Sequence, residues 1–200
     1  MALKRRRFTQ DAVRLLEEGD EVRNAIFDSL AFRTVSLKEC SFVECSFENA
    51  DLRNVRLSSA TFADCNLANA LVAGASVFGA TFERSKLLGV DFHEVERTEA
   101  LTFRQCNLDL ADFRGLDLTG VVFDRSSLVD ADLSFTTLRK ASLLEADLTR
   151  VALQETVFQQ TDLRGANLTG WNLRLLDLQG TIMDRGQLEH LALELGIQII

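Results

Sequence analysis

Large apolar residues, leucine or phenylalanine, return at every fifth position over most of the chain. We call the large apolar residue of each five-residue unit its centre. A helix repeats every 3.6 residues and a strand every 2, so neither keeps residues five apart on one side. A chain that turns a corner every five residues does, and the pattern therefore predicts a solenoid. The clearest run of centres is Phe123, Leu128, Leu133, Leu138, Leu143, Leu148, Leu153, Phe158, Leu163, Leu168 and Leu173.

A small residue stands two positions before most centres, and Asp or Asn often stands one position before. We expect the centre and the small residue to point inward, and the other three residues to face outward or shape the turn. Asn, Asp and Gly suit tight turns, and Gly often closes the unit, as in TDLRG at 161–165. The small inward residues include Cys40, Cys45, Ala50, Ala60, Cys65, Ala70, Cys106, Ala131, Ala141, Ala146 and Ala166.

One extra residue interrupts this register. Centres recur every five residues from Phe27 to Phe92 and again from Phe103 to Met183, but Phe92 and Phe103 are eleven apart. We interpret the segment between them as a bulged turn or short loop. The chain is accordingly divided into a basic tail and capping helix (1–24), a first repeat block (25–92), a register break (93–101), a second repeat block (102–183) and a C-terminal helix with a dimerisation tail (184–200).

The units ADLSF, ADLTR, TDLRG and ANLTG resemble the motif of the pentapeptide-repeat family, and the resemblance covers roughly residues 25–183. It implies an all-β solenoid, a right-handed quadrilateral parallel β-helix with four repeats in each coil. Short capping helices are expected at the two ends. We predict one over residues 9–18, with Thr9 as N-cap and Gly19 as its stop, and another over residues 187–195.

Apolar residues occupy outward positions near the C-terminus. The capping helix alone would cover some of them. Their number favours a homodimer through the C-termini, because exposed apolar patches of this kind mark contacts between subunits. The expected dimer interface comprises Trp171, Leu175, Leu176, Ile182, Leu188, Leu191, Leu195, Ile197 and Ile199.

The chain is acidic, with 30 Asp and Glu against 22 Lys and Arg and a net charge of −8. This disfavours direct binding of nucleic acid, which prefers basic surfaces, and suits a partner with a basic groove. No apolar run approaches the ~18 residues of a membrane span, and the basic N-terminus lacks the apolar stretch of a secretory signal. We therefore expect a cytoplasmic protein that does not associate with membranes.

The residues give little indication of catalysis. All four cysteines occupy small inward positions, where they act as buried apolar residues. The two histidines, His93 and His190, are far apart and lack cysteines at metal-ligand spacing. No phosphate-binding loop, nucleophile elbow or HExxH motif appears. We expect no enzymatic activity, no metal and no cofactor.

With four repeats in each coil, outward charges can be assigned to faces. Acid gathers along one corner between two faces of the second block. The interpretation as an ordinary solvated face remains open beside that of a partner-binding stripe. Two aromatic residues, Phe78 and Phe135, also fall at outward positions, either as local packing variants or as anchors for a partner. The acidic corner comprises Asp109, Asp112, Asp130, Asp132, Asp147 and Glu155.

Within the family the chain is most similar to the gyrase-interacting branch, which includes MfpA and the Qnr fluoroquinolone-resistance proteins. The stretch DFRGLDLTGVVF and the ending DRGQLEHLALELGIQII carry this resemblance. It implies a DNA-mimicking homodimer that binds the DNA-binding saddle of DNA gyrase, inhibits it, or protects it from quinolones or other poisons. One alternative is a structural or adaptor module for another protein. A second is a nucleic-acid binder acting through the basic segment KRRR at 4–7, which otherwise forms a solvated terminus.

Overall fold

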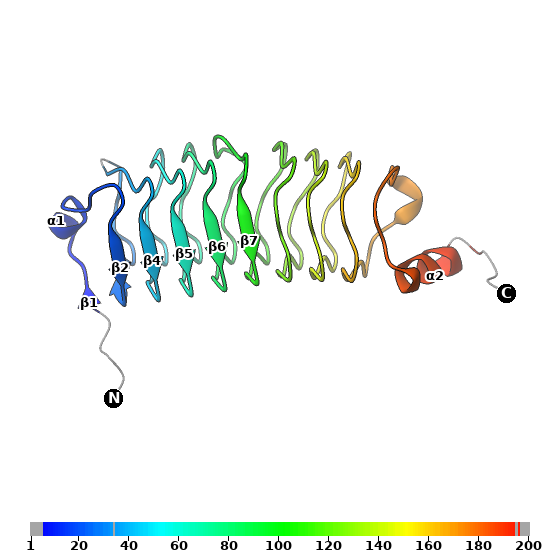
Figure 1. Ribbon diagram of the computed structural model, residues 1–200, viewed down its shortest axis with the longest axis horizontal. Coiled ribbons are helices and arrows are strands. Elements are labelled where there is room, and N and C mark those ends of the chain that lie inside the picture. Colours follow the sequence, from blue (N-terminus) through cyan, green and yellow to red (C-terminus); the bar gives the residue numbers. More distant parts are fainter. Residues whose placement is uncertain (1–5, 34, 195, 197–200) are drawn as a thin grey trace, which may run out of the picture.

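The computed structural model describes residues 6–33, 35–194 and 196. These residues form a quadrilateral parallel β-helix whose coils stack along the long axis of a rod, with α1 at one end and α2 at the other (Figure 1). The fold predicted from the five-residue period is confirmed. The chain turns a corner in every unit, and the residue after each straight stretch adopts a positive φ, as at Asn49, Asn69 and Gly89.

A five-stranded parallel sheet runs along one side of the rod, and each strand lies one coil further along the chain. We call this side face 1, and faces 2, 3 and 4 follow in chain order, with centres Leu108, Phe113 and Leu118. Beyond the last strand the same column continues as isolated bridges such as Thr102↔Val122. The strands are β2 (Glu21–Arg23), β4 (Ser41–Val43), β5 (Thr61–Ala63), β6 (Thr81–Glu83) and β7 (Thr102–Arg104).

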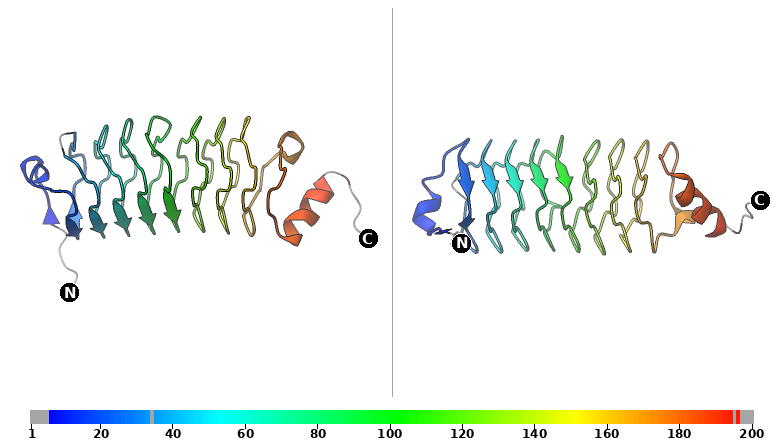
Figure 2. Two further views of the ribbon diagram at one scale, coloured as in Figure 1. Left: turned by 45° about the horizontal axis from the view of Figure 1, so that its top comes forward. Right: turned by 60° about the horizontal axis from the view of Figure 1, so that its bottom comes forward.

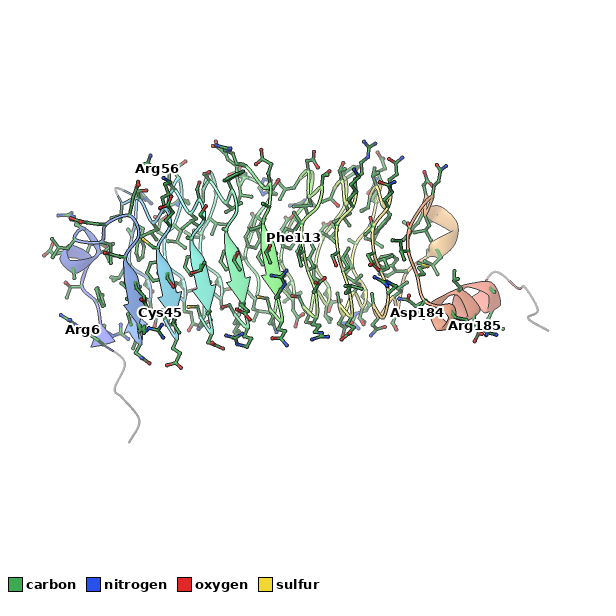
Figure 3. The ribbon with its side chains drawn as sticks, viewed as in Figure 1. Arg6, Cys45, Arg56, Phe113, Asp184 and Arg185 are labelled. Carbon is green, nitrogen blue, oxygen red and sulfur yellow. The ribbon has the colours of Figure 1, made fainter. Side chains whose placement is uncertain are left out.

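The centres fill the interior, as predicted. On face 1 the rings of Phe42, Phe62, Phe82, Phe103 and Phe123 stack at centroid distances of 5.0–5.3 Å with interplanar angles of 7–18°. These distances are typical of favourable aromatic pairs. The rod is therefore packed along its axis, as Figure 3 shows for Phe113, which lies inside while Arg56 projects from the edge.

Several polar side chains at the small inward position donate hydrogen bonds to carbonyls of the coil below. Ser85 Oγ donates to the Phe62 carbonyl at 3.1 Å and Thr161 Oγ1 to the Leu138 carbonyl at 2.6 Å. The Cys65 thiol makes the same type of contact with the Phe42 carbonyl at 3.4 Å. The side chains of all four cysteines are buried, in agreement with the inward positions predicted for them. Buried polar groups need such partners, so the core accepts serine and threonine at this position.

The ladder shifts by one residue between the two repeat blocks. Thr81 pairs with Thr102, 21 residues on, whereas Thr61 pairs with Thr81, 20 residues on. Arg97 stands where a centre is expected, and both Arg97 and Ala100 have positive φ. The Gly79 N–H still donates to the Glu99 carbonyl at 2.9 Å. The insertion is thus absorbed in a bulged corner while the ladder resumes above it.

The N-terminal segment differs from the prediction. Helix α1 covers only Gln10–Val13 rather than 9–18, although Thr9 caps it by accepting from the Ala12 N–H at 3.3 Å. After Val13 the backbone hydrogen bonds join residues three apart instead of four, and Leu16 packs against the core. The basic segment is also not wholly a solvated tail. β1 (Arg6–Arg7) pairs with β3 (Ala25–Ile26), and Lys4 and Arg5 lie outside the described residues.

The C-terminal end consists of a 3₁₀ helix, η1 (Leu173–Leu175), and α2 (Arg185–Glu194), which begins two residues before the predicted helix at 187–195 (Figure 2). Asp184 and Gln187 explain the earlier start. The Gln187 N–H donates to Asp184 Oδ1, and the Asp184 N–H donates to Gln187 Oε1, both at 2.9 Å. This reciprocal capping box fixes the first turn of α2. None of the helices among the described residues has the length and apolar character to cross a membrane.

Candidate partner-binding surface

Four members of the predicted acidic corner lie close together where faces 2 and 3 meet. Asp112 and Asp132 are ladder partners on successive coils of face 3. Asp109 and Asp130 belong to successive units of face 2. Asp109 directly follows the centre Leu108, and Asp130 ends its unit at the corner. Asp91 lies one coil below Asp112 and pairs with it, so Asp91, Asp112 and Asp132 form a column of aspartates on successive coils of face 3. The sequence carried this signal, because Asp91 directly precedes the centre Phe92.

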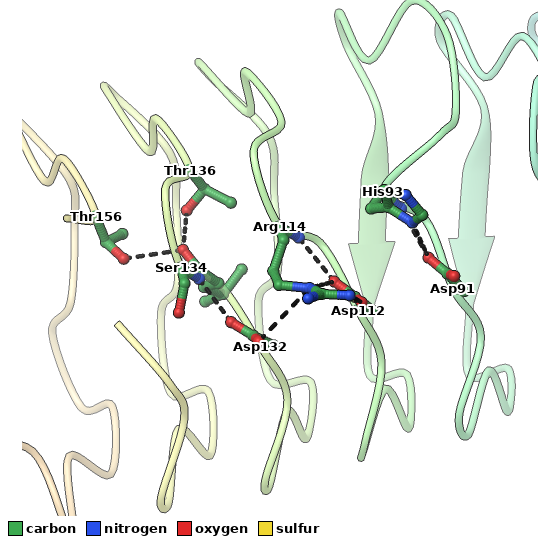
Figure 4. A network of polar contacts seen from close by, with 9 residues as sticks. Asp91, His93, Asp112, Arg114, Asp132, Ser134, Thr136 and Thr156 are labelled. Atoms are coloured by element: carbon green, nitrogen blue, oxygen red, sulfur yellow. Dashed lines mark hydrogen bonds and ion pairs between the residues drawn. The ribbon is translucent and has the colours of Figure 1, made fainter. Parts of the chain in front are cut away.

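Two arginines partly neutralise this corner, and Figure 4 shows one of them, Arg114, between Asp112 and Asp132. The Arg114 guanidinium contacts Asp112 at 2.5 Å and Asp132 at 3.7 Å. Arg150 contacts Asp130 at 2.6 Å. The hydrogen bond from Arg150 lowers the pKa of Asp130. Burial opposes ionisation of Asp112, but the Arg114 hydrogen bonds outweigh it and lower the pKa of that carboxyl. These lowered pKa values keep Asp112 and Asp130 ionised at neutral pH, and the two arginines give the corner a smaller net charge than its aspartates alone suggest.

Asp109 and Asp147, two further members of the predicted corner, accept hydrogen bonds that hold the fold. Asp109 Oδ1 accepts the Val129 N–H of the next coil at 3.0 Å. Asp147 accepts the Thr149 N–H at 3.0 Å and the Asn167 side-chain amide at 3.1 Å. Asp147 lies on the side of face 2 nearer face 1, and exposed Glu155 lies at the corner of faces 3 and 4. The structure therefore gathers four of the six predicted carboxylates and places the other two on either side.

Asp91, His93 and Asp112 form the group of possible metal ligands found among the described residues, with ligand atoms within 4.8 Å of one another. His93 Nδ1 lies 2.8 Å from Asp91 Oδ1. The Arg114 guanidinium, however, already forms an ion pair with the Asp112 carboxylate, and a metal cation would have to displace it. The arrangement is better suited to a protonated imidazole between carboxylates than to a metal ion.

The His93 ring should titrate above its ordinary range. Its hydrogen bond to Asp91 raises its pKa, and the charges of Asp91, Glu94 and Asp112 add to this, against a smaller opposing effect of burial. The pair therefore stabilises the fold below the ordinary histidine pKa, and the contribution disappears as pH rises through the raised value. An NMR titration of the ring should show a lower pKa in an Asp91→Asn variant. An unchanged pKa would contradict the contact.

Both predicted outward phenylalanines are exposed. Phe78 is 38% exposed and lies under the Arg97 guanidinium, 4.7 Å from the ring centroid. Phe135 is 49% exposed and adopts φ 62°, at the corner of faces 3 and 4, one coil below Glu155. Arg97 belongs to the register break, so a side chain of the break covers one face of Phe78. Phe135 is the more accessible of the two.

The residues predicted at the dimer interface divide into several groups. Trp171 is buried in its own chain, where its Nε1–H donates to the Leu148 carbonyl at 3.0 Å. Leu176 is half-buried. Leu175, Ile182 and Leu188 are exposed, Leu175 to 80%. The side chain of Leu191, and the whole of Leu195, Ile197 and Ile199, lie outside the described residues.

Comparisons with known proteins agree with this architecture. Family models described as pentapeptide repeat region and pentapeptide repeats match residues 22–92 and residues 106–143 and 146–185. Comparison with curated protein sequences gave no match. Two solved structures of QnrB1, a plasmid-mediated fluoroquinolone resistance protein, superpose well. A trypsin-treated form has a TM-score of 0.86 at 22% identity, covering 92% of this chain and 91% of that one. The full-length form has a TM-score of 0.83 at 20% identity, covering 96% and 95%.

HetL from the cyanobacterium Nostoc sp. strain PCC 7120 is a pentapeptide repeat protein involved in regulating heterocyst differentiation. It matches with a TM-score of 0.63 at 24% identity and covers 83% of this chain and 79% of that one. At these identities the solved structures show a shared fold.

Proposed function

Because the chain belongs to the pentapeptide-repeat family, we propose that it acts without catalysis, as a DNA mimic that binds the DNA-binding saddle of DNA gyrase. The observation that carries this proposal is the line of carboxylates at the corner of faces 2 and 3, repeated from coil to coil on an acidic rod. The likeness of the whole rod to a plasmid-mediated fluoroquinolone resistance protein supports it. Inhibition of gyrase, protection from quinolones or other poisons, or both would follow from occupying that site.

Spacing favours the mimicry. Stacked coils are ~4.8 Å apart, and phosphates of one DNA strand are about 3.4 Å apart along the helix axis. A carboxylate column on a stiff rod therefore presents negative charge at a density of the same order as a nucleic-acid strand. The arginine pairs at Asp112 and Asp130 reduce it, so affinity must also come from shape and apolar contacts such as Phe135.

The proposal includes a homodimer through the C-termini, because exposed Leu175, Ile182 and Leu188 cluster at that end. Two rods joined end to end would offer the saddle a longer mimic than one. Binding to gyrase also requires that the protein reside in the cytoplasm, where the enzyme acts on DNA.

DNA supercoiling by purified gyrase tests the proposal. Added protein should inhibit supercoiling or reduce quinolone-induced cleavage at low salt, and the effect should weaken as salt rises, because screening shortens the range of charge attraction. Absence of both effects at low salt would rule out gyrase as the partner.

An adaptor function for another protein is the second candidate, favoured by Phe135 standing exposed at a corner. It predicts binding that depends on this ring rather than on the carboxylates and that tolerates high salt. Binding of the unaltered protein to gyrase that weakens as salt rises would count against that candidate.

A further inference from the structure

The coil-to-coil ladder opens on face 3 at the last coil. One level earlier the face is fully bonded: the Leu133 N–H donates to the Ala152 carbonyl at 2.9 Å and the Phe135 N–H to the Gln154 carbonyl at 2.7 Å. The equivalent N–H groups of Leu153 and Glu155 have no such acceptor within the part of the chain that the structure describes. Unpaired strand edges of this kind accept a further strand.

Trp171 accounts for the opening. It occupies a position that small residues fill elsewhere, and its ring packs 5.3 Å from Phe158 inside the rod. The chain that follows forms η1 and stands away from the preceding coil, as the orange helix in Figure 1 shows. Ala152 therefore has a bridge to Asp132 below, but none to the described coil above.

The opening is an apolar groove with a volume of about 390 Å³. Leu153 and Val151 line one side, and Trp171, Leu175 and Leu176 line the other. Its edge offers two N–H donors, from Leu153 and Glu155, and in the described chain the Val151 carbonyl accepts no backbone N–H. This is the pattern that an extended peptide satisfies when it adds to a sheet.

We propose that the C-terminal residues 197–200 of a second copy add to this edge as a strand, an inference that rests on the proposed homodimer. Their sequence, Ile-Gln-Ile-Ile, combines strong strand preference with alternating apolar side chains that match the groove. Helix α2 lies at the same end of the rod as the groove (Figure 1), and residues 197–200 follow it in the sequence. α2 runs outward from the last coil.

A two-fold axis at this end makes the exchange reciprocal. Each copy then supplies a strand to the other and receives one, which is the closed arrangement of an isologous dimer. Six residues follow Glu194, and an extended chain of that length reaches about 20 Å. The exposed Leu175 is buried in the same step, because it forms the outer wall of the groove.

Backbone hydrogen exchange tests the added strand. In the full chain the amides of Leu153 and Glu155 should be protected, and in a chain ending at Gly196 they should exchange at least about 100-fold faster. The amides of Leu133 and Phe135 serve as the internal control, because their acceptors at Ala152 and Gln154 remain. The truncated chain should also run as a monomer in light scattering.

Cysteine cross-linking decides which copy supplies the strand. A copy carrying Glu155→Cys and a differently tagged copy carrying Ile199→Cys should form a disulfide when mixed and mildly oxidised. A copy carrying Glu145→Cys on face 1 is the matched control and should not link to Ile199→Cys. A single chain that carries both Glu155→Cys and Ile199→Cys is the second control. A disulfide that forms only within this chain, while it is monomeric, would overturn the exchange between copies.

The two proposals fail in different ways. A dimer whose Leu153 and Glu155 amides exchange rapidly would overturn strand addition but leave the homodimer standing. A full chain that is monomeric at all concentrations would remove the homodimer itself, and strand addition between copies with it. Gyrase inhibition is read separately in the supercoiling assay.

Discussion

Replacement of Phe103 by alanine is expected to lower the free energy of unfolding by about 3–5 kcal/mol, the cost of removing a large buried aromatic side chain. Phe103 is fully buried and stacks between Phe82 and Phe123, with centroids 5.2 and 5.3 Å away. It also meets Phe92 edge-on at 5.6 Å. Because each coil is covered only by its neighbours, the cavity would weaken contacts in both directions along the rod. Urea unfolding followed by circular dichroism measures the change.

Two matched variants sharpen this result. Phe103→Leu should cost less than about 1.5 kcal/mol, since most centres of the second block are leucine and the volume is largely kept. Phe135→Ala removes the same side chain from an exposed corner and should change stability by no more than about 0.5 kcal/mol. Equal losses for Phe103→Ala and Phe135→Ala would contradict the division of the chain into inward and outward positions.

The fold could be predicted because one geometric requirement is repeated along nearly the whole chain. A residue five positions from Phe103 can face the same interior only if the chain turns once in each unit, and the centres on both sides of the break obey this. Even the insertion was visible, as the eleven residues between Phe92 and Phe103. Its conformation, with Arg97 lying over Phe78, was not, because it depends on a contact between two coils.

The candidate surface was less predictable, since charge depends on neighbours twenty residues away. Arg150 forms an ion pair with Asp130, which lies one coil below it and 20 residues earlier in the sequence. Arg114 contacts Asp132 in the next coil. These ion pairs form because successive coils stack, and counting the acidic residues on one corner does not reveal them. The ends depart further, because there the repeat no longer dictates packing. α1 is short, a capping box starts α2 early, and Trp171 opens the ladder.

Reversal of four carboxylates at the acidic corner is expected to reduce the potency of the protein against gyrase by about 10-fold or more. Charge complementarity governs association with a basic groove, and like charges across an interface disfavour it. The four changes raise the net charge by eight units, from −8 to zero. The measurement is the concentration that halves supercoiling at low salt. The variant carries Asp109→Lys, Asp112→Lys, Asp130→Lys and Asp132→Lys.

A control with the same net charge separates position from total charge. Four exposed acidic residues on face 4 and in the break can be reversed together, Glu96→Lys, Glu99→Lys, Asp117→Lys and Asp177→Lys. This variant should lose much less potency if the corner of faces 2 and 3 is the contact surface. An Asp109→Asn change keeps an oxygen that can accept the Val129 N–H, so it isolates the charge of that residue from its turn contact. Equal losses in both quadruple variants would attribute binding to net charge alone, and unchanged potency in the corner variant would exclude the corner as the mimic of DNA.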